Sequence, residues 1–215
     1  MPHKHSDSDL KLVVQTKTQN IKEEARIING LFTEGLQQLN LYKPGYSYNE
    51  MHKFIDKIDV AYHPRITLYS HYGLVRKFDV GGVHIGRKSL DGFFSKLYWN
   101  YVLGRKKVEI STTVHSVRSI AHCANEFDEI LLGPVFINSG NEISNMSYKR
   151  EIFERGIEKS KSNVIVMGGV SEKNLSYLKS LDIKGVLLHS PIWDAIDPVK
   201  AYTRFRDLNR AIVIA

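Results

Sequence analysis

Four histidines stand where a side chain could do chemistry, each at or just beyond the end of a short apolar run. They are His71, His84, His115 and His189. The imidazole of histidine titrates near neutral pH, so a cluster of such side chains suits proton transfer at carbon or nitrogen. We predict catalytic roles for His115, His84 and His71, with His115 foremost because it lies between an apolar run and an expected helix start. For each one alone, the alternative is a core or rim histidine. A zinc site is less favoured because no pair has short helical spacing such as i and i+4.

A second chemical signal is the pair Gly168-Gly169, which directly follows the apolar run at 164–167, together with Ser190 after the run at 185–188. Glycine lets the backbone approach an anion closely, and a helix amino terminus offers free amides with a partial positive charge. We therefore predict that Gly168, Gly169, Ser190 and the adjacent His189 bind a phosphate. A tight turn without a ligand is the alternative explanation for the two glycines.

Polar residues at the ends of two earlier apolar runs extend the set of candidate ligand contacts. Asn40, Tyr42 and Lys43 end or follow the run at 36–41, and Ser70 follows the run at 66–69. Side chains that follow neighbouring strands meet at one edge of a parallel sheet. We predict that these four residues contact the substrate.

These candidate residues can form one site only if the fold brings the ends of many strands together. The hydrophobic pattern predicts such a fold. Eight apolar runs are spaced fairly evenly and alternate with segments of helical periodicity. Most are solidly apolar, as expected for strands buried on both faces of a parallel sheet. Eight β/α units predict a single (β/α)8 TIM barrel, whose sites lie at the carboxyl ends of the strands. An open flavodoxin-like sheet is the alternative. The predicted strands are Leu12–Val14, Leu36–Leu41, Ile66–Tyr69, Gly82–Ile85, Val108–Thr112, Glu129–Leu132, Val164–Met167 and Gly185–Leu188.

Capping residues predict the helix boundaries between these strands. Asn20 with Glu23 and Ser47 with Glu50 have the spacing of capping boxes, in which side chains satisfy the first free backbone amides. Gly35 predicts a carboxyl-terminal stop. Further helix starts are expected at Ser116, at Ser171 and at Asp197-Pro198. The expected inward-facing residues include Met51, Phe54, Ile55 and Ile58, then Val117, Ile120, Ala121 and Ala124, and finally Ala201, Tyr202, Phe205 and Leu208.

Length and composition set the broad class. A chain of 215 residues suits one domain, and we expect a barrel at 10–215 after a disordered polar tail at 1–9. The single cysteine, Cys123, excludes an internal disulfide framework and is predicted to be a buried hydrophobe. No apolar stretch approaches the ~20 residues that span a bilayer, so cytoplasm is the expected location. The net charge of +7 suits an anionic small molecule as well as nucleic acid. Because the basic residues are scattered and no nucleic-acid motif is present, we expect no nucleic acid partner and no membrane partner.

The order and spacing of several segments resemble the thiamine-phosphate synthase and TenI (thiazole tautomerase) superfamily of barrels. The resemblance runs from about residue 12 to residue 205. None of the motifs is specific alone, but their joint order is. They read GLQQLNLYKP at 35–44, GVHIG at 82–86, VHS at 114–116, LGPVF at 132–136, VMGGV at 166–170 and GVLLHSPI at 185–192.

The resemblance implies thiamine biosynthesis, with a small phosphorylated heterocycle (thiazole phosphate or thiamine phosphate) as ligand. It also implies that Gly133 and Asn138, in and after the LGPVF motif, contact the substrate. The synthases join a pyrimidine diphosphate to a thiazole phosphate with the help of magnesium, held by aspartates near the ends of strands three and four. In the tautomerase branch, a histidine that matches His115 serves as the acid/base.

This sequence departs from the synthase pattern at several positions. Ser70 and Ser89 stand where the magnesium ligands are expected, and Tyr42 stands where the synthases have an arginine. The Thr-x-Thr-Lys stretch after Phe136 is replaced by residues that include Asn138. Serine does not replace a charged magnesium ligand, so we favour a metal-independent, tautomerase-like enzyme with no cofactor. A divergent synthase, which would require magnesium, and a non-catalytic binding or regulatory protein are the alternatives.

An aromatic segment that the superfamily does not explain follows the fourth predicted strand. It predicts either a helix packed into the core or a subunit interface, and hence a possible homodimer. Its aromatic members are Phe93, Phe94, Tyr98, Trp99 and Tyr101.

Overall fold

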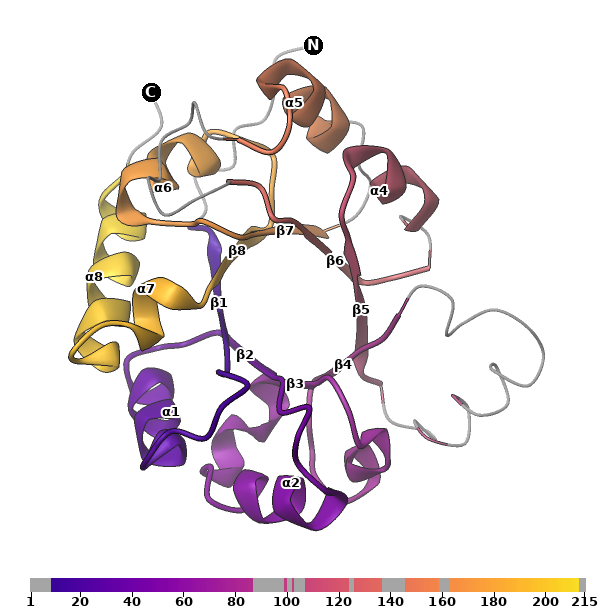
Figure 1. Ribbon diagram of the computed structural model, residues 1–215, viewed down its shortest axis with the longest axis vertical. Helices are drawn as coiled ribbons and strands as arrows, with labels where there is room; N and C mark the ends of the chain where they lie inside the picture. The colour runs from indigo at the N-terminus through magenta and orange to yellow at the C-terminus, as the bar shows by residue number, and fades with distance from the viewer. Residues whose placement is uncertain are drawn as a thin grey trace.

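The barrel closes completely in the computed structural model, which describes residues 9–86, 99, 102, 107–123, 126–136, 146–158 and 163–212. Each strand pairs in parallel with the next one along the chain, and β8 returns to β1. Figure 1 shows the resulting ring of strands with the helices around its outside. The predicted TIM barrel is therefore confirmed. The strands are β1 (Lys11–Gln15), β2 (Gln38–Leu41), β3 (Ile66–Leu68), β4 (Gly82–His84), β5 (Glu109–Val114), β6 (Glu129–Leu132), β7 (Asn163–Met167) and β8 (Gly185–Leu188).

Helices of varied length connect these strands. The helix α7 (Ser190–Trp193) is a single turn directly after β8, and two 3-10 helices flank β3. The longer helices pack on the outer surface of the barrel, as Figure 1 shows for α1, α6 and α8. The remaining helices are α1 (Glu24–Thr33), α2 (Tyr48–Ile55), η1 (Val60–Arg65), η2 (Tyr72–Arg76), α4 (Val117–Cys123), α5 (Arg150–Glu158), α6 (Glu172–Lys179) and α8 (Pro198–Ala211).

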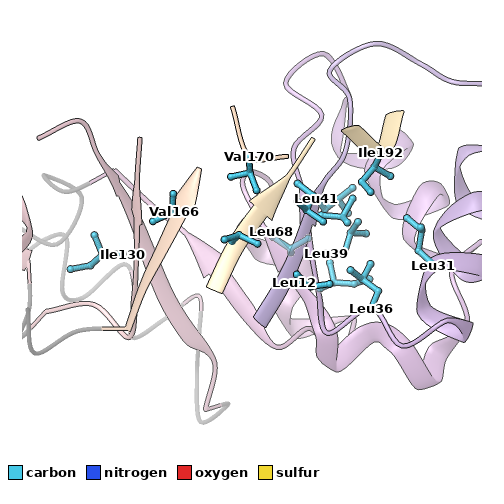
Figure 2. Close-up of a cluster of buried hydrophobic side chains, with 14 of the residues drawn as sticks. Leu12, Leu31, Leu36, Leu39, Leu41, Leu68, Ile130, Val166, Val170 and Ile192 are labelled. Carbon is cyan, nitrogen blue, oxygen red and sulfur yellow. The ribbon is translucent and has the colours of Figure 1, made fainter. Parts of the chain in front are cut away.

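The hydrophobic core has two parts because successive side chains of a strand point to opposite faces. Outward-facing residues such as Leu12, Leu39 and Leu41 pack against the helices, and Figure 2 shows them beside Leu31 of α1 and Ile192 of α7. Each of these leucines is 2% exposed or less, and burying such a side chain contributes roughly 1.5–3 kcal/mol. The second part lies inside the ring and is formed by Val13, Leu131, Ile165 and Leu187.

Several local predictions are confirmed. The capping box of Ser47 and Glu50 is present at the start of α2, with Glu50 N donating to Ser47 Oγ at 3.3 Å. Gly35 follows α1 with a φ of 93°, a conformation that glycine adopts without strain. Cys123 is buried. Among the described residues, no helix combines the length and apolar character that crossing a membrane requires.

Other local predictions are wrong. Asn20 and Glu23 form no capping box: α1 begins at Glu24, and Glu23 precedes it in the left-handed region at φ 56° without a side-chain cap. The second strand begins at Gln38 rather than at Leu36. Ala121, expected to face inward, is exposed, because α4 is only two turns long and buries Val117, Ile120 and Cys123 instead. In α8, Leu208 is only partly buried.

Some sequence-based expectations fall outside the described residues. These are the polar tail up to residue 8, Ala124, Ser89 and Asn138. The same holds for the aromatic segment except Trp99, which is buried and packs edge-on against Tyr72 at 5.0 Å between ring centroids.

Candidate active site

The carboxyl ends of all eight parallel strands share one rim, and most of the predicted site residues follow those ends. The structure brings Asn40, Tyr42 and His84 together through Tyr69, whose ring or hydroxyl contacts all three. A second group lies on the neighbouring strands, where His115 binds Gly133 and the loop after β6 packs against Gly168. The two groups lie on opposite sides of β5, which carries Ser111 and Thr113 toward His84 and ends next to His115.

His115 lies at the carboxyl end of β5 and is exposed. Its Nδ1 is 2.6 Å from the carbonyl oxygen of Gly133, and a carbonyl oxygen only accepts. The proton of the neutral ring is therefore on Nδ1, which leaves the lone pair of Nε2 unprotonated. A histidine held in this tautomer is prepared to act as a general base. Ser116 starts the following helix as expected, since Ser119 N donates to its Oγ at 3.3 Å.

His84 ends β4 and faces the barrel interior. Its ring is stacked on Tyr69, with centroids 4.0 Å apart and an interplanar angle of 10°. Nδ1 lies 3.0 Å from Ser111 Oγ and Nε2 lies 3.1 Å from Thr113 Oγ1. Burial lowers the pKa of His84 to about 4, so the ring is neutral at pH 7. These contacts suit a positioning role better than proton exchange.

His71 is held away from the other two histidines. It adopts the left-handed region with φ 52°, and its Nε2 donates to the carbonyl oxygen of Tyr46 at 2.6 Å. Its ring lies edge-on to Tyr48, with 6.1 Å between centroids. Both partners belong to the segment around the start of α2, so His71 connects the end of β3 to that segment. Neither of these contacts involves His115, and the catalytic role of His71 stays a prediction.

Gly168 and Gly169 adopt φ values of 86° and 67° directly after β7. A Cβ on Gly168 would lie 2.6 Å from Pro134 Cβ, and a Cβ on Gly169 would lie 2.6 Å from Phe136 Cβ. Backbone hydrogen bonds hold the same two loops together, since Phe136 N donates to Gly168 O at 3.2 Å. Packing between the two loops therefore already requires glycine at both positions, whether or not an anion binds there. This result supports the alternative that the two glycines form a tight turn.

The backbone amides of Gly168, Gly169 and Ser190 donate to no acceptor within the part of the chain that the structure describes. Met167 pairs with Leu187, so the loops after β7 and β8 lie side by side. Ser190 is exposed and begins α7. Burial, followed by the nearby Lys17 charge, lowers the pKa of His189. These two loops therefore present unpaired backbone donors beside a histidine whose pKa is lowered.

Lys43 and Ser70 differ sharply in their surroundings. Lys43 is fully buried, and its Nζ donates to Glu24 Oε2 and to Gln19 O. Because the ammonium group already has a carboxylate partner, we leave Lys43 out of the proposed ligand contacts. Ser70 Oγ, by contrast, is buried without a hydrogen-bond partner among the described residues. A buried hydroxyl of this kind at the end of β3 is available to a ligand.

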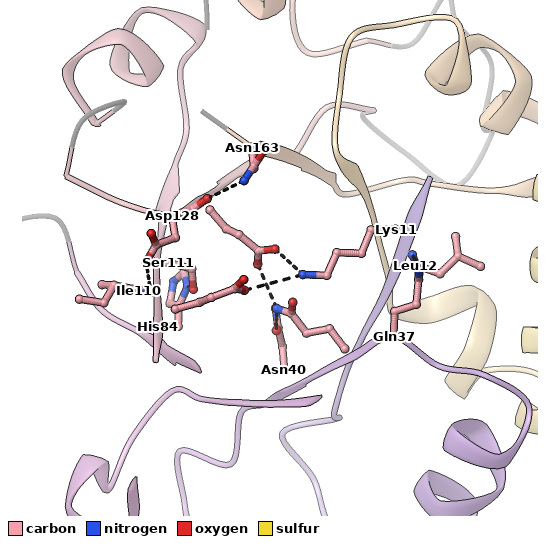
Figure 3. A network of polar contacts seen from close by, with 12 residues as sticks. Lys11, Leu12, Gln37, Asn40, His84, Ile110, Ser111, Asp128 and Asn163 are labelled. Carbon is pink, nitrogen blue, oxygen red and sulfur yellow. Dashed lines mark hydrogen bonds and ion pairs between the residues drawn. The ribbon is translucent and has the colours of Figure 1, made fainter. Parts of the chain in front are cut away.

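Sequence reasoning missed a polar network inside the barrel. Glu129 of β6 accepts from Lys11 Nζ and, at 3.2 Å, from Gln38 Nε2. Gln38 and Asn40 join this pair to Tyr69 near the rim. Figure 3 shows Lys11 and Asn40 projecting into the ring from neighbouring strands, with His84 and Ser111 on the far side. The alternation of polar and apolar residues in β2 was the available signal for an inward polar face.

Two further observations limit the location of the site. The described residues contain no group of three or more histidine, cysteine, aspartate or glutamate side chains that could hold a metal ion. A groove of about 660 Å³ is lined mainly by residues that precede β3 and β4 along the chain, and its lining includes none of the predicted site residues. Its walls come from the segments 56–60 and 77–79 together with Asn29 and His63.

Comparisons with known proteins give a curated relative and solved structures of similar fold. A thiamine-phosphate synthase from Prochlorococcus marinus is 24% identical over 156 residues, which are 72% of this chain and 39% of that protein. The chain thus spans about two fifths of the length of this curated relative. A thiamine phosphate pyrophosphorylase from Bacteroides thetaiotaomicron superimposes with a TM-score of 0.76 and 22% identity, covering 93% of this chain and 97% of the other. The corresponding protein from Pyrococcus furiosus gives a TM-score of 0.74 and 18% identity, covering 95% and 98%. No family model matches.

The similarity to the Prochlorococcus marinus protein agrees with the resemblance that the motifs indicate. At such identities, the structural likeness establishes the barrel and its order of strands. One barrel supports many reactions, because its chemistry depends on the residues of the βα loops. The reaction must therefore be argued from the residues of this site.

Proposed function

We propose that this chain is a thiamine-biosynthesis protein that binds thiazole phosphate and acts as a metal-independent thiazole tautomerase. The observation that carries the proposal is the hydrogen bond from His115 Nδ1 to Gly133 O. It leaves the unprotonated Nε2 of an exposed imidazole at the rim where barrel enzymes hold their substrates. The resemblance of VHS at 114–116 to the tautomerase motif supports the same role.

The proton transfer that this geometry supports is a balanced isomerisation. His115 Nε2 takes a proton from one atom of the heterocycle, and the electron pair of the broken bond moves into the ring. The imidazolium then returns the proton to a different ring atom. Gly133 O accepts a hydrogen bond from the Nδ1–H group throughout, which orients the ring and stabilises its positive charge. Nothing is oxidised or reduced, so no co-reactant is needed.

The phosphate group of the ligand would bind to the amides of Gly168, Gly169 and Ser190. These donors have no partner among the described residues and lie in neighbouring loops. The histidine follows β5, and the glycines follow β7, with β6 between them. Two strand spacings amount to roughly 10 Å, which suits a single ring with a short phosphorylated arm.

An assay with the thiazole carboxylate phosphate tests the proposal. Wild-type protein without added metal should interconvert its tautomers, and His115→Ala should abolish turnover while retaining affinity for the ligand. His122→Ala is the matched control, because His122 is an exposed histidine on α4. Ligand binding without turnover in the wild type would instead favour a non-catalytic binding protein.

A divergent thiamine-phosphate synthase is the second candidate, favoured by the names of the relatives. The residues of this chain fit its magnesium requirement poorly, since Ser70 follows β3 where a carboxylate is expected. Incubation with the pyrimidine diphosphate, thiazole phosphate and magnesium separates the candidates. Magnesium-dependent formation of thiamine phosphate would replace our proposal with the synthase.

A further inference from the structure

A chain of polar contacts crosses the barrel from its amino-terminal end to the rim of the candidate site. It starts at the ion pair of Lys11 and Glu129, whose side chains are 18% and 3% exposed. From Glu129 it passes to Gln38, then from Gln38 to Asn40 at 2.9 Å, and from Asn40 to the hydroxyl of Tyr69 at 2.9 Å. Figure 3 labels Lys11, where this chain of contacts begins, and Asn40, the last residue before Tyr69. The chain ends on the aromatic side chain next to the predicted ligand contacts.

The direction of each hydrogen bond in this chain follows from chemistry alone. The carboxylate of Glu129 only accepts, so Gln38 must present its Nε2. That amide nitrogen only donates, so Asn40 must present its Oδ1 to Gln38. The Nδ2 of Asn40 then faces Tyr69, and the hydroxyl of Tyr69 accepts. The proton of that hydroxyl is consequently directed elsewhere, and no acceptor for it occurs in the described segments of the chain.

The ring of Tyr69 is held firmly in place. His84 stacks on one face at 4.0 Å, and Tyr42 packs at a tilt of 56° with 5.5 Å between centroids. The hydroxyl of Tyr72 lies 2.8 Å from the backbone oxygen of His84 and 3.1 Å from that of Tyr69, so its one proton is shared between them. Burial raises the pKa of Tyr69 far above its usual value, so the phenol keeps its proton. A donor that is fixed before the ligand arrives binds it with little reorganisation.

The network is costly for a merely structural feature. A buried charge pair contributes little net stability, and apolar side chains of similar volume often do as well. Inward-facing residues on the same two strands use that solution, since Val13 of β1 and Leu131 of β6 cluster with Ile165 and Leu187. A polar network that leads instead to Tyr69 points to a function at the rim.

We infer that Tyr69 donates a hydrogen bond to the heterocycle of the bound ligand, and that Glu129, Gln38 and Asn40 impose this direction. The inference rests on the proposed function and deepens it. It assigns the acceptor on the ligand to a ring nitrogen or to a carboxylate attached to the ring. Tyr69 thus selects ligands that present such an acceptor when their phosphate is bound at Gly168 and Gly169.

Calorimetric titration of Tyr69→Phe tests the contact with three probes. These are thiazole carboxylate phosphate, the thiazole phosphate without the carboxylate, and inorganic phosphate. Loss of one hydrogen bond should weaken binding of a heterocyclic phosphate about tenfold and leave inorganic phosphate unaffected. An effect on the carboxylated probe alone assigns the acceptor to the carboxylate, and an equal effect on both assigns it to the ring nitrogen. Tyr62→Phe removes a hydroxyl from the outer surface and is the matched control.

The direction of the network can be tested by one affinity measurement and by one measurement that needs no ligand. Asn40→Asp replaces the donor to Tyr69 with a carboxylate that accepts its proton, so this variant should lose affinity as Tyr69→Phe does. In ¹⁵N-labelled protein, the side-chain amide signal that disappears in Asn40→Asp should shift in Tyr69→Phe and stay unchanged in Tyr62→Phe.

Distinct outcomes separate the inference from the proposed function. Unchanged heterocycle affinity in Tyr69→Phe, or an Asn40 amide signal insensitive to Tyr69, overturns the inference while leaving tautomerase activity intact. If the wild type binds none of the three probes, both are overturned. Selective weakening of the heterocyclic probes in a protein without turnover supports the inference and rejects the enzyme.

Discussion

His115 Nδ1 lies 2.6 Å from the carbonyl oxygen of Gly133, and this contact joins the ends of β5 and β6. Gly133 N in turn donates to Val114 O at 3.2 Å, so the two strand ends are held in register. A side chain at position 133 would not fit, because its Cβ would lie 2.3 Å from the oxygen of Met167. The packing of the β6 end against β7 therefore fixes the oxygen that orients the histidine.

We expect His115 to be in the Nδ1-protonated tautomer when its ring is neutral. Nitrogen-detected NMR of ¹⁵N-histidine-labelled protein at alkaline pH should show a pyrrole-like Nδ1 and a pyridine-like Nε2 for this residue. The signals are assigned by their loss in His115→Gln. A pyridine-like Nδ1 would contradict the assignment of Nε2 as the base.

Gly168→Ala should destabilise the protein strongly. The positive φ of 86° disfavours alanine, and the new methyl group would meet Pro134 at 2.6 Å. We expect a loss of about 2–4 kcal/mol in the free energy of unfolding, from backbone strain and overpacking together. Denaturant unfolding followed by circular dichroism measures this loss.

Gly35→Ala is the matched control for that variant. Gly35 has a similar φ of 93°, but nothing lies within 4 Å of the added Cβ. Its loss should be limited to strain, at roughly 1–2 kcal/mol. Equal losses in the two variants would show that the loop after β6 gives way to the methyl group.

His84 should make the protein less stable in acid. Its pKa is about 4 in the folded state, whereas the ordinary value of a histidine is 6.5, so the unfolded chain binds the proton more tightly. The free energy of unfolding therefore falls as the pH falls from about 6.5 to 4, by up to roughly 3 kcal/mol from this residue. His84→Gln should flatten this part of the pH profile, and His122→Gln should leave it unchanged. An identical profile in His84→Gln would refute the assignment.

The sequence predicted the barrel well because each strand is a short apolar run followed by a turn signal. It predicted the polar interior poorly, although β2 alternates as Gln38, Leu39, Asn40 and Leu41. The predicted strand began at Leu36 and was treated as one apolar run. The alternation that identifies the inward face of β2 was therefore missed. Its partner Glu129 was recognised only as the first residue of a strand, and nothing local links it to Gln38, 91 positions away.

The sequence predicted where the candidate residues lie along the strands better than it predicted which side chains they contact. The rim residues follow from strand ends, since a parallel barrel gathers these ends whatever the loops do. The role of Lys43 depended instead on a partner that the sequence does not reveal. The capping box predicted for Asn20 and Glu23 drew attention away from Glu24. The carboxylate of Glu24 accepts a hydrogen bond from Lys43, after the end of β2. Long-range pairs of this kind require coordinates.

The pair of Lys43 and Glu24 leads to a final prediction. Both side chains are buried, at 0% and 2% exposure, and burial raises the pKa of Glu24 even beside the ammonium group. Lys43→Met leaves a buried carboxylate without its partner and should cost about 3–5 kcal/mol of stability. Adding Glu24→Leu should recover most of that loss, because an apolar pair of similar volume replaces the ions. Arg150→Met at the exposed pair with Glu154 is the control and should change stability by less than about 1 kcal/mol. A double variant no more stable than Lys43→Met would show that the two side chains do not act as a pair.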